Sequence, residues 1–263
     1  MLNMLNNNAA KPGMTTVELV VAMSLATIVF VGLFGLIFSF FTTNSKSLVS
    51  LEQTQTTESA MNTIRTDLPL TRGFLATTTI DDVPPADPAV LPVPTTWRFN
   101  GLSGLNNTLI LETVSITQHP SQEDRDITYL AAGECPIGMQ PAKNNIIYYV
   151  QNQTLYRRVL VADVPQSTYC PGQSPFESRT CTDPSATNKP ANCTRKDVAI
   201  AHNISAFTVD YFEDSASAEP HPTIYTDENP QAILDNTTTI NVTLSVEKGD
   251  QYETYTAATR LSR

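Results

Sequence analysis

The chain contains four cysteines whose spacing can be assigned a chemistry: Cys135, Cys170, Cys181 and Cys193. Successive cysteines lie 35, 11 and 12 positions apart, in a stretch rich in proline and small polar residues. An even number in such a stretch favours one or two disulfides formed in an oxidising compartment. A metal site is the rival interpretation, and free thiols are a third, but no Cys-x-x-Cys pair occurs and no histidine stands beside a cysteine. Proximity alone favours Cys135 with Cys170 and Cys181 with Cys193.

A single carboxylate, Glu18, stands in "KPGMTTVELVVAM" at the start of a long apolar segment. A carboxylate inside a bilayer costs about 2.5–3.5 kcal/mol at the helix centre and less near the end, so its partner has to be found. Lys11 precedes a Pro-Gly break, so no cation on the same helix is within reach, and we expect the partner on another chain. A cut after Gly13 would supply one, because Met14 would then carry a free α-amino group.

The apolar segment from Leu19 to Phe41 has the length of a membrane span. Its 23 residues carry no charge and would form a helix of roughly 35 Å, against a hydrocarbon core of about 30 Å. A cleaved signal peptide has a shorter apolar region that ends at a small-x-small site, which is not evident here. We therefore expect a single-pass anchor in the cytoplasmic membrane. The cysteines place the N-terminus inside and the remainder outside.

The composition argues against several classes of function. The net charge of −10 disfavours a nucleic-acid grip built on a general basic field, although it is compatible with a small local basic patch. No Gly-x-Ser-x-Gly, His-Glu-x-x-His, P-loop or Gly-x-Gly-x-x-Gly motif occurs. Acidic clusters at 123–126 and 211–215 lack EF-hand spacing. We expect no catalytic residues, no cofactor and no metal, and therefore not an enzyme.

The stretch "KPGMTTVELVVAM" resembles the type III signal of type IV prepilins and pseudopilins. It joins a short leader ending in Gly13, a hydrophobic next residue, Glu18 five positions after the cut, and a long apolar helix. It departs from that pattern in having Met14 where phenylalanine is most frequent, and one leader lysine where two basic residues are common. The resemblance implies cleavage after Gly13 and N-methylation of Met14 by a membrane peptidase and methyltransferase. It also implies a role for Glu18 in assembly and axial register, with other pilin subunits as partners.

Beyond the span, the apolar positions indicate that the helix continues. Leu48, Leu51, Met61, Ile64 and Leu68 are compatible with one stripe, interrupted by polar residues 53–59, and Pro69 should end the helix. A helix from Met14 to Leu68 would be roughly 80 Å long. The expected parts are a leader (1–13), a transmembrane half (14–41), an amphipathic half (42–70) and an extracytoplasmic β-rich head (71–263).

Strand patterns dominate the head. Residues 107–117 are rich in β-branched residues, "NNIIYYVQNQTLYRRVLVA" divides at Asn152-Gln153 into a hairpin, and residues 239–246 alternate. Phe207, Val209 and Tyr211 share one face, "TWRFN" is a short strand, and residues 248–250 form a turn into the last strand. Strands without long helices between them predict an antiparallel sheet. We expect a Pro-rich connector over 71–94 and a disulfide-stapled loop, outside the sheet, over 163–203.

The stretches "NNIIYYVQNQTLYRRVL", "ISAFTVDYFED" and "TYTAATRLSR" resemble the larger minor pilins and the J-type minor pseudopilin of type II secretion. The likeness implies a pilin-like α+β fold, in which a long N-terminal helix packs on an antiparallel β-sheet head. It favours a structural subunit of a pilus or pseudopilus. A membrane-anchored extracytoplasmic binding domain that does not polymerise is the alternative. The sequence leaves open whether the filament serves adhesion, secretion or DNA uptake.

Overall fold

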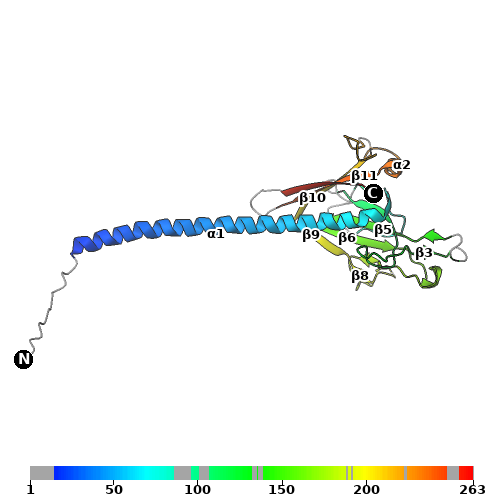
Figure 1. Ribbon diagram of the computed structural model, residues 1–263, viewed down its shortest axis with the longest axis horizontal. Helices are drawn as coiled ribbons and strands as arrows, with labels where there is room; N and C mark the ends of the chain where they lie inside the picture. Colours follow the sequence, from blue (N-terminus) through cyan, green and yellow to red (C-terminus); the bar gives the residue numbers. More distant parts are fainter. Residues whose placement is uncertain are drawn as a thin grey trace, which may run out of the picture. The chain divides into compact units, whose positions relative to one another are not determined.

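The computed structural model describes residues 15–85, 96–100, 107–131, 135, 139–187, 189–190, 192–221, 224–247 and 255–262 (Figure 1). At 45–50, 52 and 255–262 it describes the backbone alone. The chain divides into two compact units, Met1–Glu52 and Gln53–Arg263. The fold class is α+β, as expected, with a long N-terminal helix, antiparallel sheets and two disulfides. The expected leader, residues 1–13, lies outside the described residues, and so does the expected turn at 248–250.

The helix α1, Thr16–Asp67, extends through 52 residues. No proline interrupts it, and the next one, Pro69, cannot continue an α-helical hydrogen-bond ladder. At that point α1 gives way to the 3₁₀ turn η1, Leu68–Leu70. Both observed ends lie within two positions of the expected ones, which is the ordinary uncertainty of a helix boundary.

Within the second unit, the head covers one stripe of α1. The buried apolar side chains are Ala60, Met61 and Ile64, and Leu68 in η1 continues the stripe. Thr57 extends the stripe, and its hydroxyl donates to the Gln53 carbonyl at 2.8 Å, which satisfies a buried polar group. Part of the polar interruption therefore belongs to the packed face. The assignment of Leu51 to this stripe was wrong, because Leu51 belongs to the first unit and is 55% exposed.

The larger sheet has five strands in the order β1-β2-β5-β6-β9, all antiparallel. Its strands are β1 (Thr71–Phe74), β2 (Leu109–Val114), β5 (Lys143–Gln151), β6 (Thr154–Val161) and β9 (Val198–His202). The expected hairpin between β5 and β6 is confirmed, and Asn152 and Gln153 have φ values of 49° and 57°. Positive φ at both central residues is typical of a type I′ turn, whose twist matches that of the two strands it joins.

A second sheet has three strands, β10 (Ile204–Phe212), β11 (Thr239–Val246) and β12 (Tyr255–Ser262). The expected alternation is confirmed in β10 and in β11. On β10 the buried residues are Phe207, Val209 and Tyr211, and on β11 they are Ile240, Val242, Leu244 and Val246. These residues form one core with the stripe of α1 and with one face of the five-stranded sheet.

The opposite face of the five-stranded sheet carries a second apolar cluster. Its buried members are Leu75, Trp97, Ile110, Ile147, Tyr149 and Leu160. Because Ile146 and Tyr148 belong to the first core and Ile147 and Tyr149 to the second, both faces of β5 are buried. The continuous apolar run "IIYY" reflects this burial on two sides.

Three expectations for the head were wrong. Residues 71–74 form the edge strand β1, and residues 198–202 form β9, the opposite edge, although both ranges were expected to be loops. Short edge strands have too few inward positions to show alternation. In "TWRFN", Arg98 makes an isolated bridge to Thr77 and no strand forms.

The remaining elements are short. They are β3 (Tyr129–Leu130), β4 (Gln140–Pro141), η2 (Gln166–Thr168), β7 (Thr180–Cys181), β8 (Arg195–Lys196) and α2 (Pro230–Asn236). The β7–β8 pair is parallel, an exception to the expected antiparallel pairing. The helix α2 has no counterpart in the sequence prediction, since seven residues are too few to show helical periodicity.

Ile64→Ala should lower the free energy of unfolding of the head by about 2–5 kcal/mol, because it leaves a cavity between α1 and the sheet. Asn62→Ala, on the exposed face of the same turn, should change it by less than about 0.5 kcal/mol. The chain's one tryptophan, Trp97, is fully buried and reports unfolding by its fluorescence. The measurement is urea unfolding of the full chain in lipid nanodiscs. Equal midpoints for the two variants would contradict the packing role of this helix face.

Candidate functional site

The helix α1 begins with a reciprocal pair of hydrogen bonds between Thr15 and Glu18. The Thr15 backbone N–H and its hydroxyl each donate to Glu18 Oε2 at 3.0 Å. The Glu18 backbone N–H is in turn 3.3 Å from Thr15 Oγ1. This is a capping box, in which a threonine and a glutamate three positions later satisfy helix N–H groups that lack intrahelical partners.

The capping box corrects the expectation that nothing in its own chain satisfies Glu18. Its signal, "TTVE", is present in the sequence, but a capping box supplies hydrogen-bond donors and no cation, so the pattern of charges does not reveal it. The correction concerns hydrogen bonds and leaves the charge as it was. Among the described residues, no lysine, arginine or histidine forms an ion pair with Glu18, and Oε1 accepts no hydrogen bond.

After this cap comes a helical segment that is long and apolar enough to cross a membrane, Thr16–Asn44. It has 29 residues, and its described side chains are exposed. The candidate processing residues Gly13 and Met14 lie outside the described residues. Their assignment as cleavage and methylation sites therefore stays a prediction.

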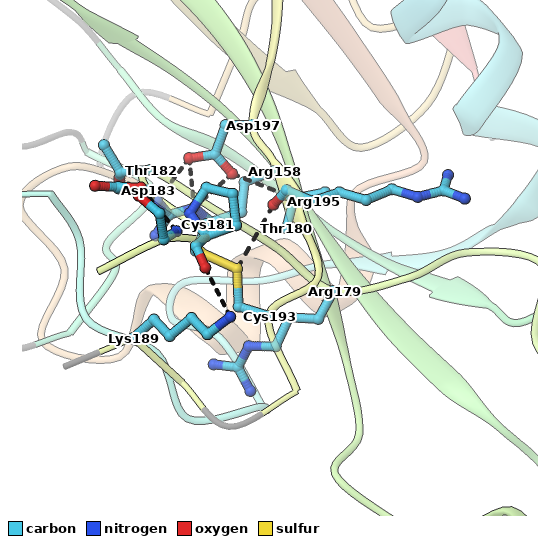
Figure 2. Close-up of a disulfide and its surroundings, with 12 residues drawn as sticks. Arg158, Arg179, Thr180, Cys181, Thr182, Asp183, Lys189, Cys193, Arg195 and Asp197 are labelled. Carbon is cyan, nitrogen blue, oxygen red and sulfur yellow. Dashed lines mark hydrogen bonds and ion pairs between the residues drawn. A yellow bond between two sulfur atoms is a disulfide. The ribbon is translucent and has the colours of Figure 1, made fainter. Parts of the chain in front are cut away.

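The four cysteines form two disulfides with the expected pairing. Cys135 is joined to Cys170 and Cys181 to Cys193, with Cα–Cα distances of 6.1 and 6.0 Å. The second bond closes a loop from β7 to the residues before β8, beside a cluster of charged side chains (Figure 2). Among the described residues, no group of three or more His, Cys, Asp or Glu side chains is arranged to hold a metal.

Arg158 is the centre of that cluster, and its side chain is 3% exposed. Its Nη1 donates to Asp82 Oδ2 at 2.8 Å and its Nη2 to Asp197 Oδ2 at 2.6 Å. The guanidinium also lies 5.1 Å from the centroid of the Trp97 ring, which is within the range of a cation–π contact. Thr182 accepts a further bond from Nη2 at 2.6 Å. The Arg158 side chain thereby holds together a segment that precedes β6 in the sequence, at Asp82, and a segment that follows it, from Thr182 to Asp197.

Asp82 serves more than one donor. Besides Arg158, it accepts from Trp97 Nε1 at 2.8 Å and from Arg179 Nη2 at 2.9 Å. Arg179 Nη2 also donates to the Asp81 carbonyl at 2.6 Å. The carboxylate of Asp82 therefore bridges two buried guanidinium groups, and its removal would leave both short of a counter-charge.

The neighbouring Arg157 forms a second cluster at the end of α1. Its Nε donates to Asp67 Oδ2 at 2.7 Å, and its Nη2 donates to Asp67 Oδ1 at 3.1 Å and to Glu177 Oε1 at 2.8 Å. The Tyr148 hydroxyl donates to the same carboxylate of Asp67. The last residue of α1 is therefore tied directly to β5 and β6, and Arg157 links this pair to the segment before β7.

Burial and charge together set the protonation states in both clusters. Burial raises the pKa of Tyr148 well above its ordinary value, and the adjacent Asp67 carboxylate raises it further, so the hydroxyl remains a donor. Burial also raises the pKa of Tyr149, which donates to Asp197 at 2.8 Å. Burial by itself lowers the pKa of Arg158, but its hydrogen bonds to Asp197 and the nearby carboxylate charges of Asp197 and Asp82 act with Tyr149 in the opposite direction, and the net pKa is raised. Arg158 therefore stays charged.

A cavity of about 510 Å³ lies beside the Cys181–Cys193 disulfide. A second cavity of about 230 Å³ shares Asp163, Arg179 and Asn192 with its lining. Among the described residues, two buried atoms of this shared lining have no hydrogen-bond partner, the donor Arg179 Nε and the acceptor Asn192 Oδ1. We call the two cavities and their three shared residues the Arg179 cleft.

Sequence reasoning missed the charged clusters. The stretch "LYRR" lies in the second strand of the expected hairpin and carries part of the family likeness, but its arginines were assigned no partner. A usable signal was present, because two adjacent arginines in an apolar strand point to opposite faces and each needs a carboxylate if its face is buried. The identity of the carboxylates could not be read, since Asp82 and Asp67 are 76 and 90 positions away from their arginines.

Comparison with known proteins assigns the chain to no family: no family model matches it, and no curated protein matches it at a significant level.

Asp82→Ala should destabilise the head by about 3–5 kcal/mol, because it leaves two buried arginines without a shared counter-charge. Asp81→Ala is the matched control, since its side chain is exposed and the carbonyl that Arg179 uses is retained. Its expected effect is below about 0.5 kcal/mol. Urea unfolding followed by Trp97 fluorescence measures both. A loss of less than about 1 kcal/mol in Asp82→Ala would contradict the bridging role.

Proposed function

We propose that the chain is a structural subunit of an extracytoplasmic filament, a minor pilin or pseudopilin of a type IV pilus or a type II secretion-like system. The observation that carries this proposal is Glu18, an acid at the first turn of a membrane-length helix with no cationic partner among the described residues. The continuation of the same helix onto an antiparallel β head supports it.

The charge of Glu18 is what favours an intermolecular partner, because its hydrogen bonds are made within its own chain. In the capping box one oxygen, Oε2, accepts both bonds, and a glutamine could take the same place. An unpaired charge in lipid is costly, so pairing with the N-terminal amine of a neighbouring subunit would favour the filament over the free anchored state. In this proposal the cap orients the carboxylate and the neighbour neutralises it.

The proposed location follows from the disulfides and the apolar helix. Disulfides persist in oxidising compartments, so the head lies outside the cytoplasmic membrane and the N-terminus inside. The partners are then other pilin subunits, the membrane, and a prepilin peptidase with methyltransferase activity that acts on Gly13 and Met14.

A second candidate, a membrane-anchored binding domain that does not polymerise, has one observation in its favour. The capping box gives Glu18 a purpose in a lone anchor, because it stabilises the first turn of the helix without any partner chain. The two candidates differ in whether the charge or the hydrogen bonding of Glu18 matters, and this difference can be measured.

The intact mass of the chain purified from its native membrane should correspond to residues 14–263 with one added methyl group. Gly13→Val should retain the leader, because it replaces the residue at which the resemblance places the cut. Leu5→Val, within the leader, is the control and should be processed normally. Removal of the first 13 residues from Gly13→Val would contradict the proposed processing.

Glu18→Gln should reduce incorporation into the filament by about tenfold or more, since about 1.4 kcal/mol of lost pairing gives that factor. Thr15→Ala is the matched variant, because it removes the capping hydroxyl and keeps the charge. It should cost about 1 kcal/mol at the helix end and incorporate normally. The measurement is the ratio of sheared filament to membrane-bound chain by immunoblot. The opposite pattern, with Thr15→Ala impaired and Glu18→Gln normal, would favour the lone anchor.

A further inference from the structure

The Arg179 cleft contains buried polar atoms that have no hydrogen-bond partner among the described residues. Arg179 is 7% exposed, lines both cavities, and has no partner for Nε among the described residues. Asn192 lines both cavities as well and leaves Oδ1 without a described partner. A buried donor without a partner is destabilising, because it has lost its hydrogen bond to water and gained none in the protein. One unpaired donor and one unpaired acceptor, on residues that line the same two cavities, indicate a site completed by a ligand.

We propose that the Arg179 cleft binds a neutral, polyhydroxylated ligand, an uncharged oligosaccharide. A hydroxyl group both donates and accepts, so the hydroxyls of an oligosaccharide can accept from Arg179 Nε and donate to Asn192 Oδ1. The exposed carboxylate of Asp163, which lines both cavities as well, accepts from a further hydroxyl. Hydrogen bonds to charged groups such as these are stronger than those between neutral groups.

The charges around the cleft favour a neutral ligand over an anion. The larger cavity is lined by four aspartates, two arginines and one lysine. Both arginines already face carboxylates, because Arg158 pairs with Asp82 and Asp197 and Arg179 pairs with Asp82. One cation of the lining, Lys189, lies outside these ion pairs and donates to the Pro184 carbonyl, so the four aspartates still outnumber the three cations and an anion would meet a net negative charge. A hydroxylated ligand meets donors and acceptors without such a penalty.

The size and arrangement of the cavities favour a ligand of more than one unit. A volume of about 510 Å³ is typical of small-molecule sites, which measure roughly 300–1,000 Å³. The cavity of about 230 Å³ shares the wall of the larger one and offers room for a second unit. A chain of linked sugars could then occupy both sides of Arg179.

The cleft is held in shape before any ligand binds. Asp82 and the Asp81 carbonyl fix Nη2 of Arg179 at 2.9 and 2.6 Å, which sets the direction of Nε. Cys193, bonded to Cys181, follows Asn192 directly and anchors that residue. Figure 2 shows Arg179, Lys189 and this disulfide together. Such preorganisation lowers the ordering cost of binding.

The test uses the full chain in phospholipid nanodiscs, which contain no sugar detergent. The probe is a printed array of neutral and acidic oligosaccharides, followed by calorimetry with the best free neutral oligosaccharide. Asn192→Ala and Asp163→Ala should each weaken binding at least tenfold. Asp124→Ala changes an exposed aspartate outside the cleft and should bind as the wild type does. The unfolding midpoint from Trp97 fluorescence verifies that each variant is folded.

Three outcomes would overturn the proposal. The first is that no neutral oligosaccharide on the array binds. The second is that a neutral oligosaccharide binds but both cleft variants retain wild-type affinity. The third is that only acidic oligosaccharides or inorganic phosphate bind, which would identify an anion site. None of these outcomes bears on processing or filament assembly, so this inference stands or falls apart from the proposed function.

Discussion

Two adjacent arginines on β6 impose the constraint on which much of the head depends. Side chains alternate along a strand, so Arg157 and Arg158 point to opposite faces of a sheet whose central strands are buried on both sides. Neither guanidinium can reach water freely, and each therefore needs carboxylates brought in from elsewhere in the chain. Asp67 arrives from the end of α1, while Asp82 and Asp197 arrive from loops on the opposite face.

This arrangement specifies a structure more than it stabilises one. Removing two charges from water costs several kcal/mol per ion. The attraction between well-placed partners offsets this cost but does not greatly exceed it. If α1 or the stapled loop packed in a wrong position, by contrast, a buried charge would be left unpaired, and no attraction would offset its desolvation cost. Asp67 therefore fixes the position of the end of the helix, and Asp82 fixes the position of the loop that borders the Arg179 cleft. Apolar packing of Ile64 and Leu68 supplies the driving force, and the ion pairs select the geometry.

The features that could be predicted from the sequence are those that local chemistry decides. Pro69 ends α1, Asn152-Gln153 closes a hairpin, the alternation in β11 marks its buried face, and short separations pair the cysteines. What could not be predicted depends on contacts distant in sequence. The edge strands β1 and β9 carry too few residues to alternate, and the partners of Arg158 lie 76 and 39 positions away. The Arg179 cleft depends on those same partners, so no local pattern marks it.

The first turn of α1 shows how local and intermolecular roles can coincide in one residue. A capping box is worth about 0.5–2 kcal/mol, whereas a carboxylate costs about 2.5–3.5 kcal/mol at the centre of a bilayer and less toward its surface. At the membrane surface the cap outweighs the charge, and Glu18 needs no partner. Deeper in the hydrocarbon the charge outweighs the cap, and a cation from another chain becomes necessary. The depth of Thr15 in the bilayer therefore decides whether Glu18 needs a cation from another chain, because its hydrogen bonds are the same at every depth and its electrostatic cost is not.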